Sequence, residues 1–384
     1  MDVRSGTVSG NEARWSKQSV STTDARRCIA RAGRQFTPPA IDRECPALTG
    51  HPSTRHAQWI ALVFILIHTA SHDPHPMTAI PNRTTRLRGG LLGLLVGDAL
   101  GVPYEFHDAA SLPPPALIDM TPPPGFARAH AGVPSGTWSD DGAQALALLD
   151  ALLRDRALNL DTFARNLLDW FHRGAFTPDG QVFDVGLQTR RAFDALAAGA
   201  APAAAGPDGE RDNGNGALMR CFPAVMIAAS RDDAIHIARK QNLVTHGHMR
   251  SQLCCALYAL TAMGILEGQS APDAVRAAED ELLARYEGTA DILELKIVLD
   301  GRFDAPQGSG YVVDSFWSAI HCLLSTGSYE DCVKRAVALG NDTDTTAAIA
   351  GSLAGALYGE AALPARWLTA LRGKSMVEGL LATF

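Results

Sequence analysis

Apolar residues recur at helical spacing along most of the chain after residue 85, and polar or glycine-rich stretches separate these segments. No segment of useful length alternates apolar and polar residues with the period of two that a half-buried strand shows. The pattern therefore predicts an all-α fold, a single compact domain of many helices. The predicted helices span residues 86–101, 144–154, 160–172, 187–198, 251–266, 272–286, 292–299, 315–324 and 329–339, and a further helix follows Asp344.

The first predicted helix, 86–101, carries a row of glycines. Gly89, Gly93, Gly97 and Gly101 recur every four residues, so they lie along one face of the helix. Each glycine costs about 1 kcal/mol of helix propensity relative to alanine. The helix should recover this cost by packing its bare face very closely against another backbone. Asp98 interrupts the apolar stretch, which is also too short to cross a bilayer, so a membrane span is excluded here.

Residues 1–84 differ from the rest of the chain. Residues 1–55 are polar and without period, which predicts disorder. Residues 58–70 form an apolar run of about 13 residues, too short to span a membrane comfortably. Met77 opens a more natural start, and we expect the working protein to begin there. The catalytic domain is predicted to span 85–384, with 1–84 a disordered extension or a misassigned start.

Composition narrows the class of protein. The formal net charge is −7 and no Lys/Arg run is present, so a nucleic-acid partner is not expected. Hydrophobic residues make up 46% of the chain, as in water-soluble globular proteins. The seven cysteines are an odd number without a Cys-x-x-Cys spacing. Free thiols in a reducing compartment, the cytoplasm, are the expectation.

Two acidic clusters each stand immediately before a helix. Asp342, Asp344 and Thr345 open the small-residue helix near the C-terminus, and Ser139-Asp140-Asp141 precedes the helix 144–154. Either cluster alone is explained by helix capping, because Asp, Ser and Thr favour the first turn. Together they offer carboxylate and hydroxyl oxygens, the hard donors that suit Mg²⁺ or Mn²⁺ better than Zn²⁺. Two such clusters could close around a metal pair.

Each of the other candidate site residues also has an ordinary structural explanation. Glu105 follows the first helix and is by default a solvated surface residue. Asp184 precedes the helix 187–198 and is equally well explained as its cap. The glycines between Asn213 and Ala217 leave backbone N–H groups free for phosphate oxygens, or form a tight turn. His246 and His248 can ligate a metal, although capping or hydrogen bonding is the commoner role.

Four blocks, taken in order, resemble the ADP-ribosylglycohydrolase family over about residues 87–371. They are Gly90-Leu91-Leu92-Gly93 through Gly97-Asp98-Ala99 to Pro103-Tyr104-Glu105; Gly136-Thr137-Trp138-Ser139-Asp140-Asp141; Gly214-Asn215-Gly216-Ala217-Leu218-Met219-Arg220; and Gly340-Asn341-Asp342-Thr343-Asp344-Thr345. Any one block is a weak signal. All four in sequence are strong, and capping alone no longer explains the acidic ones.

The resemblance implies an all-helical domain with two Mg²⁺ or Mn²⁺ ions in a cleft. By motif, one half of the metal shell comes from Ser139, Asp140 and Asp141. The other half comes from Asp342, Asp344 and Thr345, with Asp344 the candidate to bridge. Glu105 and Asp184 match the acidic residues near the substrate, so either is the candidate for proton transfer. The implied substrate-binding residues are Gly214, Asn215, Gly216, Ala217, Met219, His246 and Tyr311.

The implied activity is metal-dependent removal of ADP-ribose from modified protein side chains, most simply from arginine, by cleavage at C1″. The partners are then an ADP-ribosylated protein, the product ADP-ribose and a cognate ADP-ribosyltransferase. Serine-linked ADP-ribose, free ADP-ribose esters, phosphorus-centred hydrolysis of free nucleotides and an immunity-type protein that blocks a transferase by contact are the alternatives. A structural protein would have lost the metal carboxylates, which are complete here.

Three positions depart from the family's usual residues. Ser139 stands where threonine is common and keeps the hydroxyl group. Gly142 stands where many members have threonine, and we expect the missing hydroxyl to weaken the orientation of the ligands. Asn341 stands where glycine is frequent, and the sequence indicates no chemical consequence.

Overall fold

A computed structural model describes residues 81–384. The expectations for the disordered segment 1–55, the apolar run 58–70 and the start at Met77 lie outside the described residues. Within 81–384 the chain is helical and forms no strand, which confirms the all-α prediction. Two isolated bridges, Asp108 with Gly340 and Gly214 with Tyr311, join loops in this part of the chain.

The predicted helices are all present and begin and end within four residues of their expected positions, whereas the segments 222–227, 231–242, 365–370 and 374–381 are helices outside the predicted ranges. The first helix starts three residues earlier than predicted because the Asn82 side chain accepts a hydrogen bond from the Thr85 N–H at 2.9 Å. The α-helices are α3 (Arg83–Gly101), α4 (Asp140–Asp155), α5 (Leu160–Arg173), α6 (Leu187–Ala197), α7 (Phe222–Ile227), α8 (Arg231–Asn242), α9 (Met249–Leu266), α10 (Ala271–Tyr286), α11 (Ile292–Asp300), α12 (Val312–Leu324), α13 (Tyr329–Val337), α14 (Thr343–Tyr358), α15 (Ala365–Ala370) and α16 (Lys374–Leu381). Single 3₁₀ turns are η1 (Val102–Tyr104), η2 (Ala109–Ser111), η3 (Pro115–Leu117), η4 (Pro202–Ala204), η5 (Gly301–Phe303) and η6 (Glu360–Ala362).

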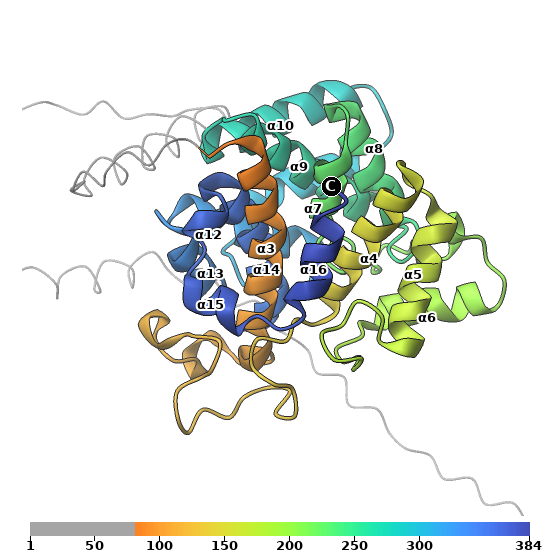
Figure 1. The fold of residues 1–384 in the computed structure, drawn as a ribbon. Helices are drawn as coiled ribbons and strands as arrows, with labels where there is room; N and C mark the ends of the chain where they lie inside the picture. Colours follow the sequence, from red (N-terminus) through yellow and green to blue (C-terminus); the bar gives the residue numbers. More distant parts are fainter. Residues whose placement is uncertain (1–80) are drawn as a thin grey trace, which may run out of the picture. The chain divides into compact units, whose positions relative to one another are not determined.

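Helices α3 and α14 form the central pair of the domain (Figure 1). The glycine row of α3 packs closely against another backbone, as predicted, and that backbone is α14. A Cβ atom added at Gly93 would lie 2.4 Å from the carbonyl oxygen of Gly351, and one at Gly97 would lie 2.1 Å from that of Ala347. No residue larger than glycine fits at such distances without moving a backbone. The two helices therefore approach more closely than ordinary side chains allow.

The remaining helices pack around this pair. Helices α12 and α13 contact α14 on one side, α4 joins α5 and α7 on the other, and α9 lies against α8, α10 and α11 (Figure 1). Helix α9 is long and apolar enough to cross a membrane, yet 89% of its apolar window is buried inside the domain. It is a core helix. Because α3 and α14 run side by side, the residues that follow α3 meet those that precede α14.

The cysteines in the described residues are all free and buried. Cys221, Cys254, Cys255, Cys322 and Cys332 lie among apolar side chains of the core. The prediction of free thiols is confirmed for these five, while Cys28 and Cys45 lie outside the described residues.

Candidate active site

The two acidic clusters meet where α4 and α14 begin. Ser139 is the N-cap of α4, and its hydroxyl both accepts the Asp141 N–H at 3.4 Å and donates to Asp141 Oδ2 at 3.1 Å. Asp342 is the N-cap of α14 but its side chain makes no capping hydrogen bond. Instead, Asp342 Oδ2 accepts a hydrogen bond from the Asn215 amide at 2.8 Å. Capping therefore accounts for Ser139 and leaves the Asp342 carboxylate without a helix-capping role.

Two carboxylate oxygens in this cluster are buried without a hydrogen-bond partner. They are Asp141 Oδ1 and Asp344 Oδ2, and both residues are fully buried. A buried oxygen without a donor costs about 1–3 kcal/mol, and more when it is charged. A bound cation would remove this cost. The oxygen donors fit Mg²⁺ or Mn²⁺, since no thiolate lies among them.

Two groups of carboxylates are close enough to share a cation. Ligand atoms of Asp98, Asp141 and Asp344 lie within 4.8 Å of one another, and so do those of Glu105, Asp342 and Asp344. Asp344 belongs to both groups. Segments that are about 200 residues apart in the chain are thus joined in one cluster by the α3–α14 packing.

The cluster accumulates negative charge away from water. Burial raises the pKa of Asp140, Asp141 and Asp344 well above the ordinary aspartate value, and neighbouring carboxylates raise it further. Burial and the nearby aspartates also raise the pKa of Glu105 to about 10. Proximity of like charges in a poorly solvated site favours protonated carboxyl groups. A divalent cation would reverse that preference by supplying the missing positive charge.

Asp98 is a site residue that the sequence interpretation missed. It is fully buried on α3, where Oδ1 accepts the Ser139 N–H at 2.8 Å and Oδ2 accepts the Gly142 N–H at 2.7 Å. Both of its oxygens thereby hold the segment that carries Asp140 and Asp141. A carboxylate inside an apolar, glycine-rich helix needs such partners. This need for hydrogen-bond donors is the feature of the sequence from which Asp98 could have been identified as a site residue.

The structure explains two of the unusual positions. A side chain at Gly142 would lie 2.7 Å from atoms of Leu95 and Trp138, so this chain has no room for the expected threonine. The Gly142 N–H is held by Asp98, which orients the start of α4 without a hydroxyl group. Asn341 has a φ of 60°, a left-handed conformation that asparagine tolerates better than most residues.

A cleft of about 240 Å³ lies beside the acidic cluster. The carboxylates of Glu105, Asp140, Asp184 and Asp342 line it together with Thr345. Other lining residues are Gly186, Leu187, Gln188, Thr189, Gly214, Asn215, Gly216, Met219, His246 and Gly310. The cleft therefore has an acidic wall and a wall of glycine backbone with one histidine. Ser139, Asp141 and Asp344 are buried behind the acidic wall.

Two predicted substrate-binding residues do not line this cleft. Ala217 is fully buried in the core, and its carbonyl oxygen accepts a hydrogen bond from Gln241 at 2.9 Å. Tyr311 is 38% exposed beside the cleft, where it forms the bridge with Gly214 and its hydroxyl accepts from Arg250 at 3.3 Å. The role of Tyr311 at the distal end of a ligand stays a prediction.

Asp184 does not cap the helix that follows it. Gly186 is the N-cap of α6 and no side chain bonds there. Asp184 has a φ of 53°, lines the cleft and interacts with Asp140. Burial and the charge of Asp342 raise the pKa of Asp184 to about 6. The structure thus removes the capping alternative and places this carboxyl group beside the acidic wall.

Glu105 is buried and paired with a histidine, contrary to its default as a surface residue. His130 Nε2 lies 2.7 Å from Glu105 Oε2, and the His130 ring contacts the rings of Phe106 and Phe183 at centroid distances of 5.6 and 5.1 Å. Nothing in the sequence marked His130, because it lies in a proline-rich loop without periodicity.

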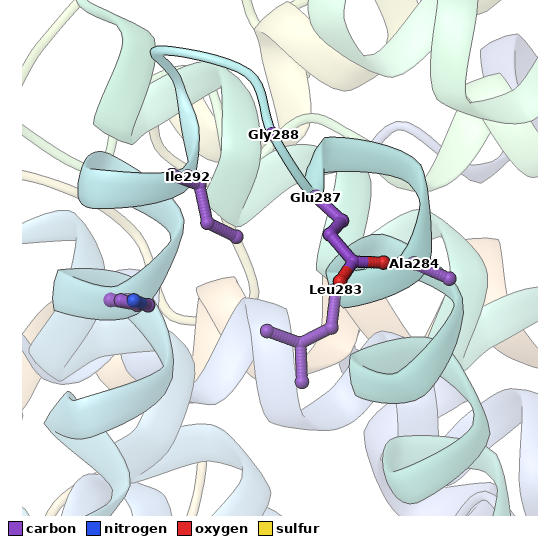
Figure 2. Close-up of a pocket in the computed structure, with 6 residues that line it drawn as sticks. Leu283, Ala284, Glu287, Gly288 and Ile292 are labelled. Carbon is purple, nitrogen blue, oxygen red and sulfur yellow. The ribbon is translucent and has the colours of Figure 1, made fainter.

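A second hollow, of about 490 Å³, lies between α10 and α11 and away from the acidic cluster (Figure 2). Leu283, Ala284 and Ile292 line it, with Glu287 and Lys296 as its charged residues. None of its residues has a buried polar atom without a partner. Its chemistry gives no reason to place a reaction there.

Comparison with known proteins identifies a family and several similar chains. The family model described as ADP-ribosylglycohydrolase matches residues 79–383. The chain is 30% identical over 298 residues to ADP-ribosylarginine hydrolase Tri1 of Pseudomonas putida, covering 74% of this chain and 73% of the relative. It is 28% identical to the ADP-ribosyl-[dinitrogen reductase] glycohydrolase of Rhodospirillum rubrum, covering 76% and 92%. A solved structure described as an ADP-ribosylglycohydrolase-related protein complex shares 31% identity with a TM-score of 0.65, covering 79% of this chain and 97% of that one.

Proposed function

Because the chain belongs to the ADP-ribosylglycohydrolase family, we propose that it is a hydrolase that releases ADP-ribose from modified protein side chains, with arginine as the modified residue. The observation that carries this proposal is the cleft with an acidic wall and a glycine-rich wall. In the glycine wall the N–H groups of Gly214 and Asn215 already donate to Gln188 Oε1 and to the Gly310 carbonyl oxygen, both at 3.1 Å. The Gly216 N–H makes no hydrogen bond within the protein, so it is free to donate to a phosphate oxygen. The acidic wall lies where the ribose at the modified end would sit.

The proposed cofactor is a pair of Mg²⁺ or Mn²⁺ ions. The residues that would hold them are Asp141, Asp342 and Asp344, whose oxygens lie close to those of Asp98 and Glu105. By the family motif they also include Asp140, Thr345 and the Ser139 hydroxyl group. The unpartnered oxygens of Asp141 and Asp344 support this assignment, and the place of Asp344 in both carboxylate groups supports a bridging role. When bound, the cations supply positive charge that fixes sugar hydroxyls and polarises a nucleophile.

The reaction breaks the bond between C1″ and the guanidine nitrogen while water adds at C1″ through an oxocarbenium-like state. The departing nitrogen needs a proton, and a proton must leave the attacking water. We assign proton transfer to Asp184, because its carboxyl group lines the cleft beside the acidic wall and does not cap α6. Glu105, hydrogen-bonded to His130, would accept hydrogen bonds from the substrate instead.

Arginine is favoured by the residues around Glu105. A guanidinium group is a planar cation that hydrogen-bonds to carboxylates and stacks on aromatic rings. Glu105 and Asp184 supply the carboxylates, while Phe106, 71% exposed, and Phe183 supply rings that both contact the His130 ring. A serine oxygen carries no charge and no planar face, so it would use neither aromatic ring. The substrate would come from a transferase that attaches ADP-ribose to arginine.

The linkage is tested by measuring release of ADP-ribose from an arginine-modified protein and a serine-modified peptide under one set of conditions with Mg²⁺. We expect faster release from arginine. In Phe106→Ala, release from arginine should fall roughly fivefold through loss of ring–cation contact, with unchanged affinity for free ADP-ribose. Faster release from serine would contradict the arginine assignment, and release from neither would contradict the hydrolase itself.

A further inference from the structure

Arg220 is a fully buried arginine whose hydrogen-bond partners are all uncharged. It lies just before α7, and its side chain contacts residues of α4, α5 and α8. Its guanidinium donates to Gln241 Oε1 at 2.8 Å, Gln144 Oε1 at 2.5 Å and Thr245 Oγ1 at 2.6 Å. It also packs over the Phe163 ring at 5.1 Å. Burying a charge in this way costs several kcal/mol, and an apolar side chain would fill the space without that cost.

One line of hydrogen bonds runs from Arg220 to the acidic wall. Arginine can only donate, so Gln144 must turn its amide oxygen toward Arg220. The Gln144 NH₂ group then faces Asp140, and it donates to Oδ2 at 3.0 Å. Arg220 thereby fixes which end of the Gln144 amide meets the Asp140 carboxylate.

A second line runs from Arg220 to the glycine wall. Thr245 Oγ1 accepts from Arg220 and lies 2.8 Å from His246 Nδ1. If Nδ1 carried a proton, Thr245 Oγ1 would accept twice and its own hydroxyl hydrogen would be buried without an acceptor. That arrangement is costly. The Thr245 hydroxyl therefore donates to Nδ1, and the proton of the neutral ring lies on Nε2.

His246 Nε2 lies at the cleft. A Cβ atom added at Gly216 would be 3.1 Å from this nitrogen, and one at Gly214 would be 3.4 Å away. The ring is buried and lines the cleft beside these glycines. An Nε2–H group here would add a donor to the backbone N–H groups of the glycine wall.

We infer that Arg220 is a positioning residue that, through Thr245, fixes His246 as an Nε2–H donor and, through Gln144, holds the Asp140 carboxylate. The buried guanidinium group of Arg220 would then align both the acidic wall and the glycine wall of the cleft. The His246 donor would face an anionic or hydroxyl oxygen of the ligand, such as a phosphate oxygen. The ligand's identity rests on the proposed function, whereas the tautomer does not.

The test is the nitrogen-15 spectrum of the His246 ring in the full chain without substrate, beside the affinity for ADP-ribose. The parent protein should show a neutral ring protonated at Nε2. Thr245→Val should lose this single tautomer and bind ADP-ribose about tenfold more weakly. Thr245→Ser keeps the hydroxyl and should restore both. A folded Arg220→Met should also populate the Nδ1–H form.

A parent ring protonated at Nδ1 or at both nitrogens overturns the inference. So does a Thr245→Val protein with the parental tautomer and affinity, or a folded Arg220→Met protein with the parental spectrum. If Arg220→Met does not fold, the comparison of Thr245→Val with Thr245→Ser still tests the inference. Because the spectrum is recorded without substrate, a failed hydrolase assay leaves this result intact.

Discussion

Replacing Asp344 by asparagine is expected to lower the rate of ADP-ribose release by at least about 10³-fold, because charge stabilisation by a bound cation is worth several kcal/mol. Asp344 has a buried oxygen without a partner and belongs to both groups of close carboxylates. An amide there would weaken both halves of the cluster. The measurements are the release rate and the calorimetric affinity for Mn²⁺.

The same substitution should stabilise the metal-stripped protein. Burial and nearby carboxylates raise the pKa of Asp344 well above 3.8. When folding raises the pKa of a carboxyl group, the free energy of unfolding of the protein falls as the pH rises from the unfolded-state pKa toward the folded-state pKa. The amide avoids that loss, so Asp344→Asn should melt higher than the parent at neutral pH, and the difference should shrink toward pH 4.

Asp150→Asn is the matched control for Asp344→Asn. Asp150 is also buried, on α4, but it accepts from Asn166 at 2.9 Å and pairs with Arg154 at 2.7 Å. We expect its replacement to leave the release rate unchanged and to lower the melting temperature. If Asp344→Asn kept parental activity or parental Mn²⁺ affinity, the carboxylate cluster would not be the metal site.

Gly97→Ala is expected to destabilise the fold by about 3 kcal/mol, the upper part of the range for overpacking. The added Cβ would lie 2.1 Å from the Ala347 carbonyl oxygen, so one of two central backbones must move. For a domain of this size the melting temperature should fall by roughly 5–10 °C. Thermal unfolding of the metal-stripped protein measures the effect apart from cation binding.

For Gly379→Ala, on another helix of the same domain, we expect the opposite effect, a more stable fold. Gly379 lies in α16 with open space around its Cβ position. Alanine there should raise the free energy of unfolding by about 1 kcal/mol, because alanine has the higher helix propensity. If Gly97→Ala were as stable as the parent, α3 and α14 would not be packed as closely as described.

The row of glycines on α3 could be interpreted from sequence because its spacing has a direct consequence in three dimensions. A glycine face recovers its cost in helix propensity only by packing closely against another backbone, and in the structure that backbone is α14. Pairing α3 with α14 also brings Glu105 near Asp342 and Asp344. The close packing of the α3 glycine face was therefore predictable, whereas the sequence did not identify α14 as its partner. The two acidic clusters meet because Asp98 of α3 also accepts hydrogen bonds from the Ser139 and Gly142 N–H groups.

Other parts of the site depend on long-range packing that no local pattern records. His130 approaches Glu105 only because the loop after η3 folds back over the end of α3. Arg220 belongs to a motif used in the sequence comparison, yet its partners Gln144 and Thr245 come from α4 and the segment after α8. Asp98 was within reach of sequence reasoning, since a lone buried carboxylate demands donors.

We propose that the acidic cluster binds a divalent cation and that ADP-ribose is released beside it. The most direct measurement is the rate of ADP-ribose release from an arginine-modified protein by the metal-stripped enzyme, before and after addition of Mg²⁺ or Mn²⁺, beside Asp342→Ala. We expect no release without metal, recovery of release when metal is added, and no recovery in Asp342→Ala. Equal release without metal, or full recovery in Asp342→Ala, would contradict this proposal.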